Sequence, residues 1–213
     1  MSTKLDGIAE IAKEKPKEKF TSLIHLIDKD MLMQCHKELK ENKATGIDKV
    51  TKQEYEMNLE PNINDLIVRM KNHTYRPQAV RRIYIPKPNS DKKRPLGIPS
   101  YEDKMVQMAI NKILKAIYEQ DFLDCSFGFR ENRSCHDALK ILDLYLTDRN
   151  TNYVVDADIK GFFDHVSHEW MMKFLGERIK DPNLLRLIGR FLKAGIMEEG
   201  KFYKVYEGTP QGS

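Results

Sequence analysis

The strongest constraint on the fold is the segment TNYVVDADIKGFFDHV, which spans residues 151–166. Its apolar run carries Asp156 and Asp158 two residues apart, and side chains along a strand alternate between the two faces of a sheet. We therefore predict a buried strand over residues 152–159 that presents both carboxylates on one face. Buried carboxylates are costly unless they are paired with cations or bind a metal. Hard oxygen ligands of this kind suit Mg²⁺, and salt bridges to Lys or Arg are the structural alternative.

The rest of the sequence predicts several helices and a few separated strands. Apolar residues at helical spacing indicate helices within the ranges 20–43, 51–72, 106–117, 136–146, 168–180 and 184–194. Strands are predicted at 81–86, 95–98 and 202–206, and the turn PNSDKK joins the first two into a β-hairpin. This mixture indicates an α+β fold rather than a regular βαβ alternation. We expect residues 1–19, which are mostly Lys, Glu and small residues, to form a tail or a frayed helix.

The composition excludes several classes of protein. The chain has 213 residues, of which 40% are hydrophobic, enough to build a packed core. No apolar run approaches the ~20 residues of a membrane span, and the N-terminal stretch lacks a secretory apolar segment, so we expect no membrane partner. The three cysteines, Cys35, Cys125 and Cys135, show no CxxC spacing. We therefore predict reduced thiols and a cytoplasmic location.

The net charge of +4 conceals a strong asymmetry along the chain. The window from Arg69 to Arg94 holds nine basic residues and one acid, Asp91, so it carries a charge of +8. Such a stripe predicts contact with a polyanion, and Tyr75 and Tyr84 within it could stack on bases. A solvated basic surface is the alternative. The candidate nucleic-acid-binding residues are Arg69, Lys71, Arg76, Arg81, Arg82, Lys92 and Lys93.

Several motifs together resemble one protein family. VVDADIKGFFDHV resembles the first catalytic motif of reverse transcriptases in their bacterial group II intron form. In the same order along the chain, ENKATGID resembles the N-terminal extension motif, RRIYIPKPNSDKKRPLGIP the fingers hairpin, FLDCSFGFRENRSCHDAL the next block, and GTPQGS the start of the following palm motif. The resemblance implies the front part of a right-hand polymerase. Residues 1–19 would then be a tail, 20–150 the fingers with the N-terminal extension, and 151–213 part of the palm.

The resemblance also implies an activity and roles for particular residues. The family's reaction is RNA-directed DNA synthesis with two Mg²⁺ ions, or Mn²⁺, on an RNA template with a DNA or RNA primer and dNTPs. Asp158 matches the catalytic metal-binding aspartate, and the backbone carbonyl of Ile159 matches a second metal ligand. Asp156 matches an acid for which a salt bridge to the fingers is the favoured role. The residues that match dNTP-binding positions are Lys87, Arg94, Phe163, Arg130 and Gln211. For Phe163, ordinary core packing is the alternative.

The family's Tyr-x-Asp-Asp motif, which follows GTPQGS, is not found in this sequence. The 213 residues contain no Asp-Asp dipeptide, and Tyr101-Glu102-Asp103 precedes Asp158, so we interpret it as the start of a helix. We therefore expect this chain to bind nucleic acid but to polymerise poorly alone, whereas its parent would also aid splicing of its intron RNA. Two alternatives stay open: a non-catalytic module that anchors intron RNA, and a retron-type or defence-associated reverse transcriptase. The sequence leaves the oligomeric state open.

Overall fold

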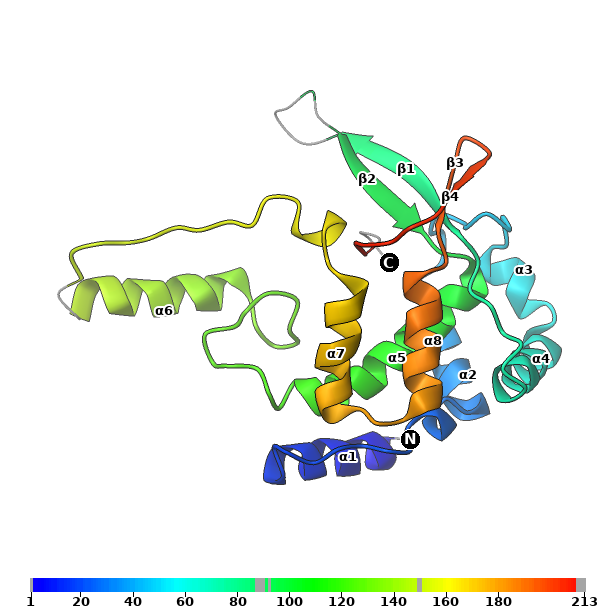
Figure 1. Cartoon of the computed structure of the whole chain (residues 1–213), viewed down its shortest axis with the longest axis horizontal. Coiled ribbons are helices and arrows are strands. Elements are labelled where there is room, and N and C mark those ends of the chain that lie inside the picture. The colour runs from blue at the N-terminus through cyan, green and yellow to red at the C-terminus, as the bar shows by residue number, and fades with distance from the viewer. Residues whose placement is uncertain (1, 87–90, 92, 149–150, 210–213) are drawn as a thin grey trace.

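The computed structural model describes residues 2–86, 91, 93–148 and 151–209 of the chain. These residues form eight α-helices, two short 3₁₀ helices and one four-stranded sheet (Figure 1). The predicted α+β class is therefore confirmed. The α-helices are α1 (Ser2–Glu14), α2 (Lys29–Glu38), α3 (Lys52–Glu56), α4 (Leu59–Lys71), α5 (Tyr101–Tyr118), α6 (Cys135–Asp148), α7 (His168–Arg178) and α8 (Pro182–Leu192). The 3₁₀ helices are η1 (Ile24–Leu26) and η2 (Phe162–Asp164), and the strands are β1 (Val80–Pro86), β2 (Lys93–Ile98), β3 (Ile196–Glu198) and β4 (Lys201–Tyr203).

Helix α5 is the centre of the hydrophobic core. Met105, Val106 and Ile113 on its apolar stripe are inaccessible to solvent, and helices α1 and α2 pack against it. The helix begins at Tyr101, as predicted, because the side chain of Ser100 accepts a hydrogen bond from the backbone N–H of Asp103 and so caps the first turn. The strong apolar periodicity of this segment thus predicted both the helix and its burial.

The N-terminal segment, predicted to be a tail or a frayed helix, contains helix α1, which docks against the core. Ala12 in α1 is only 1% exposed, and Leu5 and Ile8 pack against the core. Arg178 from α7 donates hydrogen bonds to the carbonyl oxygens of Ala12 (3.3 Å) and Glu18 (3.2 Å). Leu5, Ile8 and Ala12 follow one another at spacings of three and four residues, so they lie on one side of α1, and this side packs against α5.

The sheet has the strand order β2-β1-β3-β4. The predicted hairpin is confirmed, with antiparallel pairs that run from Arg81↔Ile98 to Pro86↔Lys93. Strand β3 was not predicted; it pairs parallel with β1 through only two residue pairs, Val80↔Ile196 and Arg81↔Met197. Strand β4 pairs antiparallel with β3 and ends at Tyr203, three residues before the predicted end. The β1–β2 hairpin is therefore joined to the rest of the sheet by a short ladder.

The predicted buried strand at 152–159 is wrong in this structure. These residues form no strand, and Tyr153, Val155 and Ile159 are 89%, 89% and 69% exposed. None of the described strands lies beside the segment, so its backbone has no ladder of hydrogen bonds and its side chains have no cover. Helix α6, which precedes it, also extends away from the other helices (Figure 1). We call α6 and residues 151–160 the arm, and the other described residues the body.

Candidate functional site

Two motifs that are about forty residues apart in the sequence lie side by side. The backbone N–H of Gly208 donates to the carbonyl oxygen of Val166, and the N–H of Thr209 donates to the carbonyl oxygen of Phe163, both at 2.7 Å. The ring of His168 adds a third link, because its Nε2 atom lies 2.7 Å from the carbonyl oxygen of Gly208. The start of GTPQGS is thus fixed against the end of VVDADIKGFFDHV. Gln211 lies outside the described residues.

This junction requires glycine at position 208. Gly208 has a φ of +83°, and a Cβ atom there would lie 2.7 Å from the carbonyl oxygen of Asp164 and 3.0 Å from that of Phe163. A second glycine, Gly161, has a φ of +64° and starts the 3₁₀ helix η2. Both turns therefore determine where the ring of Phe163 is placed.

Phe163 is available at the surface of this junction. Its side chain is 42% exposed and meets the ring of Phe162 edge to face, with centroids 5.5 Å apart and an interplanar angle of 73°. The alternative of ordinary core packing therefore does not describe this ring. A half-exposed aromatic face beside the junction suits stacking against a flat or sugar-bearing ligand.

The two acids of the first motif lie on the arm. Asp156 and Asp158 are both exposed, and among the described residues neither forms an ion pair, so the expected salt bridge from Asp156 to the fingers is not present there. The described residues also contain no group of three or more His, Cys, Asp or Glu side chains that could enclose a metal. The carboxylate of Asp158 and the carbonyl of Ile159 fit the donor chemistry of Mg²⁺, which needs few protein ligands. These two groups would supply only part of a coordination shell.

Within the basic window, several side chains are held by protein groups. Arg69 donates from Nη2 to both carboxylate oxygens of Glu102 at 2.8 Å and from Nε to Asp65 at 2.6 Å. Burial raises the pKa of Glu102, and the ion pair with Arg69 opposes that rise. Tyr75 is 1% exposed and donates its hydroxyl to Asp103, so it is not free to stack on a base. These contacts give Arg69 and Tyr75 a structural role between α4 and α5.

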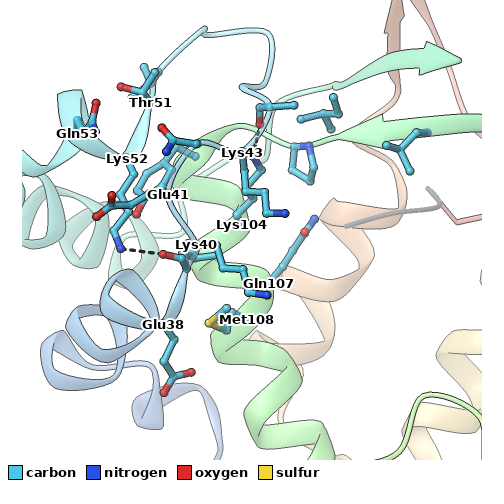
Figure 2. A pocket seen from close by; sticks show the side chains of 18 of the residues that line it. Glu38, Lys40, Glu41, Lys43, Thr51, Lys52, Gln53, Lys104, Gln107 and Met108 are labelled. Atoms are coloured by element: carbon cyan, nitrogen blue, oxygen red, sulfur yellow. Dashed lines mark hydrogen bonds between the residues drawn. The ribbon is translucent and has the colours of Figure 1, made fainter. Parts of the chain in front are cut away.

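Arg81, Lys104 and Lys52 hold the loop between α2 and α3. Arg81 donates to the carbonyl of Thr45 at 2.6 and 2.9 Å, Lys104 to that of Ala44 at 2.6 Å, and Lys52 to that of Leu39 at 2.7 Å. The loop, β2 and α5 surround a hollow of about 880 Å³, in which loop lysines and α5 side chains face one another (Figure 2). Its labelled lining residues include Lys40, Lys43, Gln107 and Met108.

Other cations of the window remain at the surface. Lys71, Lys93 and Arg94 are exposed, and none of them forms an ion pair with another described residue. Among the described residues, Arg76 donates hydrogen bonds only to backbone carbonyls, and Nη1 of Arg82 lies 3.9 Å from a carboxylate oxygen of Glu198. Lys87 and Lys92 lie outside the described residues. Cations available to a polyanion thus remain on the β1–β2 hairpin.

Arg130 organises the loop that follows α5. Its Nε atom donates to Glu119 at 2.8 Å, and Nη1 donates to the carbonyls of Leu123 (3.0 Å) and Ser126 (2.9 Å). The guanidinium also lies over the ring of Phe122, 5.0 Å from its centroid. The side chain therefore positions the loop from which it comes.

Comparison with known proteins decides the family. Residues 85–213 match the family described as reverse transcriptase (RNA-dependent DNA polymerase). The chain belongs to the reverse transcriptase family. The matched residues include the end of β1, all of β2, the first motif, and the junction at Gly208.

Relatives of this chain include intron-encoded proteins. The chain is 40% identical over 209 residues to the group II intron-encoded protein LtrA of Lactococcus lactis subsp. cremoris, a match that covers 98% of this chain and 35% of that protein. It is 38% identical over 170 residues to protein YkfC of Escherichia coli (strain K12), covering 78% and 44%. An uncharacterized 91 kDa protein in the cob intron of Schizosaccharomyces pombe is 32% identical over 216 residues, covering 99% and 26%. The chain thus spans about a third of LtrA's length and less than half of the other two.

Sequence reasoning missed one residue that links the β1–β2 hairpin to strand β3. Glu198 in β3 accepts a hydrogen bond from the hydroxyl of Tyr84 in β1 at 2.6 Å and lies 3.9 Å from Arg82. No local signal could have found it, because β3 is only three residues long and its partner is 114 positions away.

No helix in the described part of the chain is long and apolar enough to cross a membrane.

Proposed function

We propose that this chain provides the template- and nucleotide-binding part of an RNA-directed DNA polymerase of group II intron type. One observation carries the proposal. The family match over residues 85–213 contains both Asp158–Phe163 and Gly208–Thr209, and hydrogen bonds hold the ends of these motifs together. In this proposal, residues 20–150 are the fingers with an N-terminal extension, and 151–213 are the first part of the palm.

The site residues have distinct roles in this proposal. Asp158 and the carbonyl of Ile159 would hold Mg²⁺, or Mn²⁺, which in two-metal phosphoryl transfer activates the primer oxygen and neutralises the triphosphate. Phe163 would lie beneath the incoming sugar and exclude a 2′-hydroxyl by contact with its ring. Lys87 and Arg94 on the fingers hairpin would bind the triphosphate, whose charge shifts to the leaving group as the bond breaks. Arg130 and Gln211 would act near the nucleotide and template.

The expected partners are an RNA template, a primer and dNTPs in the cytoplasm. The name of the relative LtrA, a group II intron-encoded protein, supports intron RNA as a further partner. Exposed cations on the hairpin support backbone contact with any of these nucleic acids. Help with intron splicing is part of the same proposal.

Primer extension with Mg²⁺ and dNTPs tests the polymerase proposal. The 213-residue chain is expected to bind a primed RNA template but to extend the primer poorly or not at all, because the sequence has no Asp-Asp dipeptide. In a longer chain that also contains a Tyr-x-Asp-Asp sequence, Asp158→Ala should abolish synthesis and leave RNA affinity mostly unchanged. The matched variant Asp156→Ala should retain synthesis. Robust synthesis by the 213 residues, or no synthesis by the longer chain, would contradict the proposal.

A further inference from the structure

Helix α8 carries cations on the side opposite its apolar residues. Leu184 and Ile188 are buried in the core, whereas Arg186 and Lys193 are exposed and Arg190 is half-buried. The three cations follow one another at spacings of four and three residues, so they lie along one side of the helix.

Arg190 joins this row of cations to the turn that follows α4. Its guanidinium donates to the carbonyl oxygens of Tyr75 at 2.9 Å and His73 at 3.0 Å. Arg76 donates to the same two carbonyls, at 3.1 Å and 2.7 Å. Two guanidinium groups that share two acceptors lie close together, although their charges repel. Desolvation first, and then the charges of Arg76 and Arg186, lower the pKa of Arg190.

Acidic residues are absent from the two stretches of chain that meet here. Residues 66–86 contain five Lys or Arg and residues 182–197 contain three, and neither stretch contains Asp or Glu. Within the described part of the chain, Arg186 and Lys193 form no ion pair, and the hydrogen bonds of Arg76 and Arg190 go only to backbone carbonyls. Arg76, Arg186, Arg190 and Lys193 thus form no ion pair with another described residue, although Arg69 and Arg82 of the first stretch do, and four unneutralised cations attract a polyanion.

We propose that Arg76, Arg186, Arg190 and Lys193, together the α8 basic face, bind the phosphate backbone of an RNA. Guanidinium groups match phosphate oxygens with paired N–H donors, and Arg76 and Arg190 are already oriented by their carbonyl contacts. The row from Arg186 to Lys193 extends about 10 Å along the helix, enough to face more than one phosphate. The choice of RNA as the ligand rests on the proposed function. The position and the charge of this face do not depend on the proposed function.

Binding of a labelled RNA hairpin to the 213-residue chain, measured over a range of KCl concentrations, tests this site. The double variant Arg186→Gln/Lys193→Gln removes two exposed cations that form no ion pair within the described residues, so the fold should persist, which circular dichroism checks. We expect roughly tenfold weaker binding near ~0.1 M salt and a slope of log K against log salt that is smaller by about 1.5. Two hairpins of unrelated sequence should show the same loss, because phosphate contacts do not read sequence.

Lys17→Gln/Lys19→Gln is the matched control. It also removes two exposed lysines, from the segment after α1, and should change affinity by less than about twofold. If the α8 variant binds RNA like this control, with an unchanged salt slope, the α8 site is overturned while RNA binding by the unaltered chain still supports the proposed function. If the unaltered chain does not bind RNA, both proposals are overturned.

Discussion

Helices α8 and α6 both have mostly apolar sequences, yet they have opposite surroundings. Leu184 and Ile188 of α8 are 0% and 8% exposed, whereas Leu139 and Leu144 of α6 are 60% and 53% exposed. Helix α8 belongs to the body, where α7 packs against it, and α6 belongs to the arm. The difference teaches that apolar periodicity predicts a helix reliably but does not predict whether a partner surface covers it.

The largest contrast should come from deleting an apolar side chain in each region. Ile113→Ala in α5 removes a fully buried side chain and should lower the free energy of unfolding by about 2–5 kcal/mol. Leu142→Ala in α6, where the side chain is 45% exposed, should change it by less than about 0.5 kcal/mol. Urea denaturation followed by circular dichroism measures both. Equal losses would mean that α6 is packed in solution and would break the comparison.

A second contrast concerns the acids at the starts of helices α8 and α6. Asp181 at the start of α8 accepts backbone hydrogen bonds from Leu23 (2.6 Å), Ile24 (2.8 Å), Asn183 (2.9 Å) and Leu184 (3.2 Å). Desolvation opposes its ionisation, but these four bonds outweigh it and lower the pKa of Asp181. Asp181→Asn should therefore cost about 1–3 kcal/mol at neutral pH.

The lowered pKa of Asp181 also predicts how its contribution to stability changes with pH. Because the folded-state pKa of Asp181 is lowered, its stabilisation is complete above the unfolded pKa near ~3.9 and is lost as the pH falls through the folded value. The variant should therefore lose less stability than the unaltered chain between about pH 5 and pH 2. Asp137→Asn in the exposed first turn of α6 is the control and should leave global stability nearly unchanged. If the free energy of unfolding falls equally with decreasing pH in the unaltered chain and in Asp181→Asn, this account is contradicted.

The smallest predicted effect tests the junction beside the arm. Gly208→Ala introduces a Cβ atom 2.7 Å from the carbonyl oxygen of Asp164 at a φ of +83°. Gly200→Ala, at a φ of +78° with no atom within 4 Å, carries only the backbone strain. We expect Gly208→Ala to cost about 1 kcal/mol more than Gly200→Ala and to speed amide exchange at Thr209. Equal costs would mean that the junction is loose in solution.

The sequence predicted elements whose signals are local. The hairpin β1–β2 and the helix α5 carry their own turn residues, alternation and apolar stripe, and both formed where expected. Strand formation at 152–159 depends on neighbouring strands that local patterns do not reveal. The structural roles of Arg69 and Arg130 depend on ion pairs with Glu102 and Glu119, and neither the basic window nor the motif around Arg130 shows that these cations are already paired. At the candidate site, the roles of Phe163 and Asp158 remain predictions. The structure adds the hydrogen bond from the backbone N–H of Thr209 to the carbonyl oxygen of Phe163.

Because the ladder between β1 and β3 has only two residue pairs, the β1–β2 hairpin projects beyond it and can rotate about it. From Arg81 to Pro86, β1 extends about 17 Å beyond that ladder, at roughly 3.3 Å per residue. A rotation of about one degree at the ladder therefore moves the far end of the strand by about 0.3 Å. The hydrogen bond from Tyr84 to Glu198 lies partway along this length and restrains it at its middle. Small adjustments near Val80 are thus magnified at the end of the hairpin where Arg94 lies.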